Sequence, residues 1–433
     1  MTDTVATTQL EVVDYDLGLR GKLARAGKTR GGSALSFCTI LYGLSVIDDV
    51  TDTPFSNAAN GYPDAPLVPD ESTRIELPWR PGTDAVIAEL IGADGRPLEL
   101  SPRAVLGSLN QGYAELGLQP VLGFEYEMWL FVESPGAPGV GGALPGYVPF
   151  GRTENAYSLT RGNEIHSLAT EFINRMQQVG IEVEMFHGEL GPGFFEFTLA
   201  PAPAIRAADN AARARQYLRD LCAERGMHAS FMSKPFADKS GAGGHVHSSL
   251  TRDGVNVFAD ETGAALSEVG THYLAGLLAG MPDTALMMNP NVNSYKRIDP
   301  EMYTPSVADW GYDNRSAAAR VLLGERKSAR VEHRRPGADA NPYLVAAALL
   351  AAGLRGLRER MALPGGDSDP VALPGDLGAA LSRFEGSVWL PELLGNQFCA
   401  SFAATRRAEL QRYETWLQKT ITSWELTRHL EHQ

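Results

Sequence analysis

A strongly basic segment, residues 315–343, constrains this chain more than any other feature of its sequence. Within residues 315–335, six arginines and one lysine stand against two glutamates, although the whole chain carries a formal net charge of −14. Concentrated positive charge in an acidic protein indicates a local task, namely binding a strongly anionic group. Charge runs more often form a solvated salt-bridge face, but here apolar residues 321–323 lie just upstream and an almost wholly apolar helix is predicted downstream. We therefore expect the arginines to lie beside the core.

The order of residues inside this segment adds a second constraint. Arg330, Glu332 and Arg334 recur at every second position, so on a β-strand they share one face. Two guanidiniums beside a carboxylate suit a site in which phosphate, metal and carboxylate lie together. Asn341 followed by Pro342 then predicts the start of a helix, with Asn341 as its N-cap.

Length and composition bound the remaining possibilities. The 433 residues allow two or three domains, or one large and one small, and 44% hydrophobic with 21% charged residues is typical of a globular protein. A pI near 5.2 argues against general nucleic-acid binding and against a basic membrane-binding patch. The three cysteines are scattered, no signal-peptide pattern opens the chain, and the longest apolar run is too short to span a bilayer. We expect a soluble cytoplasmic protein with no zinc site and with neither nucleic acid nor membrane as a partner.

Secondary-structure signals divide the chain near residue 100. Ser101 is the predicted N-cap of a helix at the boundary between a small β-rich domain, residues 1–103, and a larger domain, residues 104–433. From residue 118 strands and helices mix without a regular βαβ rhythm, and the Gly/Pro-rich residues 133–151 are typical of a functional flap. The tail is predicted to be helical, with residues at core spacing: Leu410, Tyr413, Leu417, Ile421 and Trp424.

Two pairs of glutamates are candidates for metal binding. Glu125 and Glu127 alternate inside an apolar strand, and two neighbouring carboxylates in a core repel each other unless cations lie between them. An edge strand with one wet face is the alternative explanation for this pair alone. Glu189 and Glu196 flank a Gly-Pro-Gly turn, so a hairpin lets them face the same cleft.

Histidines complete a ligand set of oxygen and nitrogen atoms. A single histidine is more often a core residue than a ligand, but His245 and His247 alternate after a Gly-rich turn, which favours ligation. With Glu332, the carboxylates and one imidazole form a hard donor set that suits Mg²⁺ or Mn²⁺ rather than zinc. Added to the arginines, this set predicts divalent metals that bridge nucleotide phosphates, with arginines neutralising a transferred phosphoryl group. The chain carries no GxxxxGK[ST] motif, which excludes a P-loop enzyme.

The order of these motifs along the chain resembles the glutamine synthetase superfamily. The motifs are EYE, E-x-GPG-x-x-E, GGHVHSSL, NPNVNSYKR, NRSAAAR, ARVEHR and ANPYL. Each is weak alone, but seven in order with fitting gaps, from about Gly21 to the C-terminal helix, carry a strong signal. The resemblance implies an α+β protein with an N-terminal β-grasp domain and a C-terminal catalytic domain of antiparallel strands with helices. It also implies a homo-oligomer, a dodecamer of two stacked hexameric rings, with each active site between neighbouring subunits.

The resemblance also implies a role for each motif residue. The metal ligands form two groups: Glu127, Glu189 and Glu196 for one ion, and Glu125, His245 and Glu332 for the other. The residues facing the phosphates of ATP are Arg315, Arg320 and Arg330, and those facing the nucleotide are His247 and Ser249. The L-glutamate contacts are Arg297 and Arg334 at the α-carboxylate, and Gly241 near the amino group. Phosphoryl transfer from ATP would turn the γ-carboxylate into an acyl phosphate, which an amine then attacks.

Departures from the family pattern concern the amine. Tyr303 stands where ammonia-using members carry a glutamate that shields the intermediate and helps to deprotonate ammonium. The DGSS-type motif whose aspartate binds ammonium in those members is missing from residues 48–64. Glu301 or an aspartate of residues 48–52 would have to serve the amine instead. Residues 61–83 resemble the γ-glutamylpolyamine synthetase branch.

The predicted function is therefore an ATP-dependent glutamate–amine ligase that forms a γ-glutamylamide from an organic amine. Tyr303 is assigned to the catalytic residues and to the amine pocket, and a monoamine is favoured because no second anion for a diamine can be placed. Glutamine synthetase using ammonia is the first alternative. The second is a binding or structural protein on the same fold, which the intact ligand residues and arginines disfavour.

Overall fold

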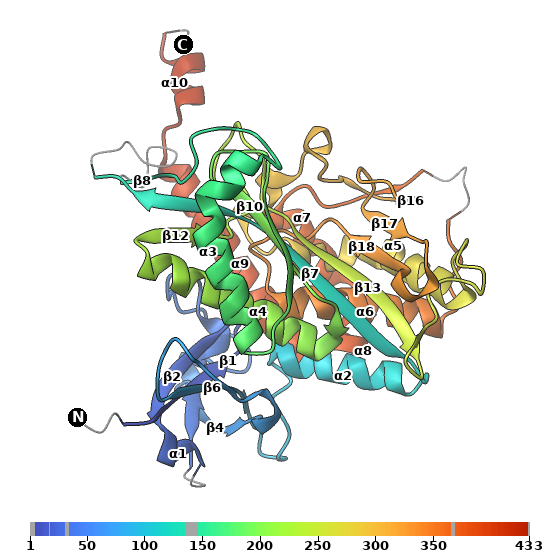
Figure 1. Ribbon diagram of the computed structural model, residues 1–433, viewed down its shortest axis with the longest axis horizontal. Helices are drawn as coiled ribbons and strands as arrows, with labels where there is room; N and C mark the ends of the chain where they lie inside the picture. Colours follow the sequence, from blue (N-terminus) through green and yellow to red (C-terminus); the bar gives the residue numbers. More distant parts are fainter. Residues whose placement is uncertain (1–4, 17, 31–33, 136–145, 365–368, 432–433) are drawn as a thin grey trace.

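Two β-sheets organise the protein in the computed structural model, which describes residues 5–16, 18–30, 34–135, 146–364 and 369–431 (Figure 1). A six-stranded sheet is formed by the first 90 residues, and an eleven-stranded sheet is formed by residues 119–333. The predicted flap at residues 133–151 lies largely outside the described residues.

The N-terminal sheet is mixed. Its strands are β1 (Thr7–Val12), β2 (Arg20–Arg25), β3 (Ser36–Cys38), β4 (Asp64–Pro69), β5 (Ile75–Glu76) and β6 (Thr83–Leu90). They follow the order β2-β1-β6-β4-β3, with β5 also paired to β6, and β1 runs parallel to β6. The central strand β6 is buried along almost its whole length, as expected of a strand covered on both faces.

The large sheet follows the order β16-β17-β18-β13-β7-β10-β9. These strands are β16 (Trp310–Tyr312), β17 (Ala319–Leu322), β18 (Arg330–His333), β13 (Gly244–Arg252), β7 (Gln119–Glu133), β10 (Phe194–Leu199) and β9 (Val183–Gly188). Four short strands extend it, namely β8 (Tyr147–Pro149), β11 (Ala202–Pro203), β12 (Met227–Ser230) and β14 (Val255–Asn256). A separate ribbon joins β15 (Val307–Ala308) to β19 (Val371–Ala372).

Helices surround the large sheet (Figure 1). The longer ones are α2 (Pro102–Ala114), α3 (Leu159–Gln178), α4 (Ala204–Glu224), α5 (Glu268–Met288), α6 (Pro342–Arg358), α7 (Leu377–Gly386) and α9 (Asn396–Lys419). Both predicted N-caps are confirmed: the Ser101 side chain accepts from Ala104 N–H, and Asn341 accepts from Tyr343 and Leu344 N–H. Helix α6 is buried over nearly its whole length. Within the described ranges, no helix combines the length and the apolar character that crossing a membrane requires.

The C-terminal tail differs from the sequence prediction. It is helical, but after α9 the short helix α10 (Ser423–His429) projects away from the body (Figure 1). Leu417, Ile421 and Trp424 are 42%, 68% and 63% exposed, so the prediction that they reach the core is wrong. The tail is not one continuous helix, because residues 420–422 separate α9 from α10, so the predicted spacing does not place these side chains on one helix face.

Candidate active site

Cross-strand pairing gathers the candidate ligands on one face of the large sheet. The directly opposed pairs are Glu125 with His245, Glu127 with Glu196, and His247 with Glu332. Cross-strand partners point to the same face. The alternate residues of β7, Phe124, Tyr126 and Met128, are buried on the other face. The alternative explanation for Glu125 and Glu127, an edge strand with one solvent-exposed face, is wrong, because β7 lies between β13 and β10.

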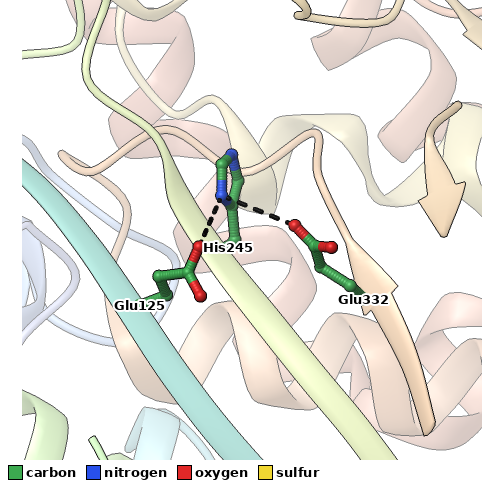
Figure 2. A group of neighbouring side chains, drawn as sticks. All are labelled: Glu125, His245 and Glu332. Atoms are coloured by element: carbon green, nitrogen blue, oxygen red, sulfur yellow. Dashed lines mark hydrogen bonds and ion pairs between the residues drawn. The ribbon is translucent and has the colours of Figure 1, made fainter. Parts of the chain in front are cut away.

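One ligand group consists of Glu125, His245 and Glu332 (Figure 2). His245 Nδ1 lies 3.3 Å from a Glu125 carboxylate oxygen and 3.7 Å from a Glu332 carboxylate oxygen. Figure 2 shows the imidazole between the two carboxylates, one from each flanking strand. One ligand atom from each residue lies within 4.8 Å of the others, which brings together the donors predicted for one divalent ion.

The local electrostatics of this group favour positive charge. Burial raises the pKa of Glu125, but hydrogen bonds and charges from His245 and His247 outweigh burial and hold that pKa well below its ordinary value. Burial lowers the pKa of His245, yet its hydrogen bond to Glu125 and the nearby glutamates raise the pKa overall. Electrostatics that favour ionised carboxylates and positive charge at this place also fit a divalent cation.

A second ligand group lies on the β9–β10 hairpin and consists of His187, Glu189 and Glu196. His187 Nε2 lies 3.0 Å from Glu196, and Nδ1 lies 3.3 Å from Glu189. Burial, with repulsion from Glu125 and Glu127, raises the pKa of Glu196 to about 7. Burial lowers the pKa of His187, but hydrogen bonds to Glu189 and Glu196 outweigh it and raise that pKa to about 10. His187 was not predicted as a ligand, although its alternation with Glu189 at the two-residue period of a strand indicated a shared face.

Glu127 was predicted to complete this second group, and its assignment stays a prediction. Its carboxylate lies opposite Glu196 and accepts a hydrogen bond from Gly243 N–H at 2.5 Å. A Cβ atom on Gly243 would come within 2.7 Å of His245 Nε2 and 3.2 Å of Glu127. Side chains of both groups therefore press against Gly243, and the close approach requires glycine.

Arg161 of α3 positions the hairpin and was also missed. Its guanidinium, 2% exposed, donates to the backbone carbonyls of Asn155, Glu189, Gly191 and Phe194. These bonds fix the turn between the candidate ligands Glu189 and Glu196. An arginine in an amphipathic helix gives no sequence signal for this role.

The arginines of the basic segment surround the first ligand group. Arg320 Nη1 lies 3.0 Å from one oxygen of Glu332, and Arg334 forms an ion pair with the other. Arg330 Nε donates to His247 Nδ1 at 3.1 Å. The predicted face shared by Arg330, Glu332 and Arg334 is therefore present, and it meets the acidic face of β7 across β13.

Two of the arginines that line the site hold buried donors without a partner in the described structure. Arg297 and Arg334 are 4% and 8% exposed, and among the described residues neither Nε atom has a hydrogen-bond acceptor. Buried polar atoms are normally paired, so unpaired donors in a cavity indicate a place for an anionic ligand. Gly241 packs directly on Arg297, since a Cβ at Gly241 would lie 2.6 Å from Arg297 Cγ.

All of the predicted site residues line one cavity of about 1000 Å³. Besides Tyr303, the lining also includes Tyr157, Leu190 and Met302. Both tyrosines have a φ of 58° and are more than half exposed, at 69% and 57%. Bulky residues rarely adopt this left-handed conformation, and such residues cluster at functional sites. The Tyr157 ring also lies 5.2 Å from the ring of His187.

Several known proteins are similar to this chain in sequence and in fold. Residues 99–429 match the family glutamine synthetase, catalytic domain. Glutamate–isopropylamine ligase of a Pseudomonas species is 32% identical over 446 residues, covering 99% of this chain and 95% of that protein. γ-Glutamylethanolamide synthetase of Streptomyces coelicolor is 32% identical and covers 91% and 85%. Glutamine synthetase of Pyrococcus abyssi is 32% identical and covers 85% and 86%. A solved GmaS/ADP complex matches with a TM-score of 0.83 at 26% identity, covering 99% of this chain and 97% of that one.

The chain belongs to the glutamine synthetase superfamily, because the catalytic-domain match extends over most of its length and its relatives cover nearly all of it. The predicted family, the α+β fold with a β-grasp and a catalytic domain, and the ligase class are confirmed. The exact domain boundary and the individual residue roles stay predictions.

Proposed function

We propose that this protein is an ATP-dependent glutamate–amine ligase that uses a small organic amine. The single observation that carries the proposal is one cavity lined by two carboxylate–imidazole groups and five arginines: Arg297, Arg315, Arg320, Arg330 and Arg334. The γ-carboxylate of L-glutamate attacks the terminal phosphorus of ATP, and ADP leaves. The amine nitrogen then attacks the acyl phosphate carbon, phosphate leaves, and the nitrogen loses a proton. Both steps develop negative charge on oxygen, which guanidinium groups stabilise.

Within this proposal, each part of the cavity has a chemical task. The unpaired Nε donors of Arg297 and Arg334 support binding of the α-carboxylate of glutamate. Arg315, Arg320 and Arg330 face the phosphates, and His247 and Ser249 line the wall assigned to the nucleotide. Each ligand group offers two carboxylates and one imidazole, and a bound Mg²⁺ or Mn²⁺ would neutralise charge on phosphate oxygens there.

The amine assignment rests on the apolar lining of the cavity. Tyr157, Leu190, Met302 and Tyr303 offer aromatic and aliphatic surface that suits an alkyl substituent better than ammonia. Two similar proteins are named for isopropylamine and ethanolamide products or substrates, which supports a monoamine. Glutamine synthetase remains the second candidate because a Pyrococcus glutamine synthetase has the same identity. Glu301 is exposed, lies two residues before Tyr303, and is one group available to accept the amine proton.

We also propose a cytoplasmic homo-oligomer of two hexameric rings with active sites between subunits. Apolar residues left exposed on one chain support association, since monomeric proteins rarely expose large apolar patches. They include Val46 and Ile47, beside the aspartates of residues 48–52, and Ile421 and Trp424 of the tail. Light scattering after size-exclusion chromatography gives the mass, and a monomer would contradict this arrangement.

A phosphate-release assay tests the reaction. It uses L-glutamate, ATP and Mg²⁺ with ammonium, small alkylamines, ethanolamine, aromatic amines, putrescine and spermidine, and mass spectrometry identifies the product. We expect the highest kcat/KM with an organic monoamine. The highest value with ammonium would instead identify glutamine synthetase. No phosphate release with any amine, together with no thermal stabilisation by Mg²⁺–ATP, would favour a protein that has lost catalysis.

A further inference from the structure

Arg335 is a buried arginine beside the cavity that lines no part of it. The residue is 1% exposed, and each side-chain nitrogen group donates to a neutral oxygen. Nε donates to Asn289 Oδ1 at 3.0 Å, Nη1 to the Pro305 carbonyl at 2.6 Å, and Nη2 to the Pro374 carbonyl at 2.7 Å. Burial, with repulsion from Arg297, lowers the pKa of Arg335 to about 10. A charge is thus buried in order to hold three oxygens from three separate segments.

The segment that contains Pro305 follows the part of the cavity lining assigned to the amine. Residues 302–304 line the cavity, and Pro305 follows them directly. The loop closes on itself, because the Asp299 carbonyl accepts hydrogen bonds from both Met302 N–H and Thr304 N–H at 3.0 Å. These internal bonds fix the shape of the loop but not its position against the site. The Arg335 bond to Pro305 supplies that position.

The segment that contains Pro374 is hydrogen-bonded to the segment that contains Pro305. Leu373 N–H donates to the Ser306 carbonyl at 2.9 Å, and β15 pairs with β19 immediately beyond. Arg335 therefore bonds to Pro305 and Pro374, which lie on the two segments at one end of this small antiparallel ribbon. The Arg335 carbonyl also accepts from Arg297 Nη1 at 3.1 Å, so the same residue connects the ribbon to an arginine of the glutamate-binding wall.

A purely structural role is the simpler explanation, but it does not account for the charge. An apolar side chain of similar size would fill the same volume without the cost of burying a guanidinium. The carbonyls of Pro305 and Pro374 both accept from this one buried guanidinium, so its removal takes the donor away from two backbone acceptors at once. A guanidinium fork is the one side chain with enough donors, in a fixed plane, for three such acceptors.

We propose that Arg335 is a positioning residue that sets the place of the Tyr303 loop and thereby the selectivity for the amine. This inference rests on the proposed ligase function. Displacement of a binding residue by about 1 Å can cost about a hundredfold in rate, so loss of the clamp should be felt mainly by the substrate that the loop contacts. The bond from Arg297 goes to the backbone carbonyl of Arg335, which a side-chain substitution keeps, so binding of glutamate and ATP at their own walls should be affected much less.

Two substitutions test the role by steady-state kinetics, with each substrate varied separately. Arg335→Met keeps the volume and removes all donors, and Arg335→Lys keeps the charge but not the fork. We expect Arg335→Met to raise the KM for the preferred amine at least about tenfold and to reduce its kcat/KM advantage over ammonium. The KM values for glutamate and ATP should stay within about threefold, and Arg335→Lys should lie between Arg335→Met and wild type.

Arg213→Met is the matched control. Arg213 is 5% exposed, and it donates to Glu11 at 2.8 Å and to the Thr73 carbonyl at 2.8 Å, at the contact between the two sheets' domains. This variant should lower the Tm without changing amine selectivity. Equal increases in all three KM values for Arg335→Met, or an unchanged amine KM as in Arg213→Met, would overturn the inference.

Hydrogen–deuterium exchange gives a readout that does not depend on turnover. Amides of residues 299–306 should exchange faster in Arg335→Met than in wild type. In Arg213→Met their exchange rates should equal those of wild type. Unchanged exchange in Arg335→Met would refute the clamp even if the enzyme is active. If wild-type protein uses no amine and no ammonium, the proposed function fails, while this exchange experiment still decides whether Arg335 positions the loop.

Discussion

The proposed function assigns Arg334 to the α-carboxylate of glutamate and Arg320 to the phosphates of ATP. Lysine variants of the two residues test this assignment, and each variant is a control for the other. Both guanidiniums bind Glu332, one at each carboxylate oxygen. Replacing either with lysine disturbs this ligand carboxylate in a similar way. A difference between the two variants therefore reports the substrate that each arginine contacts.

The magnitude follows from the unpaired donor. Arg334 is buried and its Nε has no acceptor within the described structure, so a bound carboxylate gains that donor together with the positive charge. Lysine keeps the charge but cannot reproduce the planar fork. Loss of one charge-assisted hydrogen bond costs about 1.5–3 kcal/mol. At about 1.4 kcal/mol per factor of ten, Arg334→Lys should raise the glutamate KM by about tenfold to a hundredfold.

The assay measures phosphate release at saturating amine, with glutamate and ATP varied in turn. Arg334→Lys should leave the ATP KM within about threefold, whereas Arg320→Lys should lower kcat and weaken ATP more than glutamate. Equal effects on both substrates in Arg334→Lys would mean that Arg334 contacts phosphate. The same pattern in both variants would mean that only Glu332 was disturbed, and the division of the arginines would be refuted.

Three further predictions concern the metal group, the amine and acid stability. His245→Ala should abolish ligase activity and weaken Mn²⁺ binding measured by electron paramagnetic resonance, while the oligomer persists; near wild-type turnover would remove His245 from the site. Tyr303→Glu should shift the kcat/KM ratio toward ammonium, and an unchanged ratio would show that Tyr303 does not contact the amine. Burial raises the pKa of Asp84, but hydrogen bonds and charges from neighbours including Arg30 and Arg74 outweigh burial and hold that pKa below its ordinary value. Stability from this carboxylate is therefore present above its unfolded-state pKa of about 3.9 and lost as pH falls through the lower folded-state pKa, so the Tm deficit of Asp84→Asn should shrink from about pH 7 to about pH 3. A deficit that is constant with pH would contradict this account.

Much of the site was predictable because alternation along a strand survives folding. Glu125 and Glu127, like His245 and His247, needed only the two-residue period of a strand to share a face. The caps Ser101 and Asn341 were predictable because their hydrogen bonds are local. These are features that a few neighbouring residues decide.

The parts that were missed depend on register and on distant segments. His187 joins the ligand group because β9 pairs with β10 in the register that sets His187 opposite Glu196. Arg161 and Arg335 act on backbone carbonyls from segments that are far away in the sequence, and no periodicity encodes such contacts. Trp424 shows the limit of such a period, since the break between α9 and α10 interrupts the predicted helical spacing, and the ring contacts only Arg428 and His429 of its own helix among the described ring contacts.

The distribution of charge across the large sheet explains why the site lies over β13. Acidic residues lie on β7 and β10, basic residues lie on β17 and β18, and the Glu125–His245–Glu332 group lies where the two halves meet. Buried carboxylates cost free energy unless cations face them, and buried guanidiniums need acceptors. Within the described structure each half keeps an unbalanced group: Arg334 Nε has no acceptor, and burial with repulsion from Glu125 and Glu127 raises the pKa of Glu196. In the proposed function, a nucleotide with bound metal ions would offer anionic groups to the basic half and cations to the acidic half, so its binding should stabilise the folded protein.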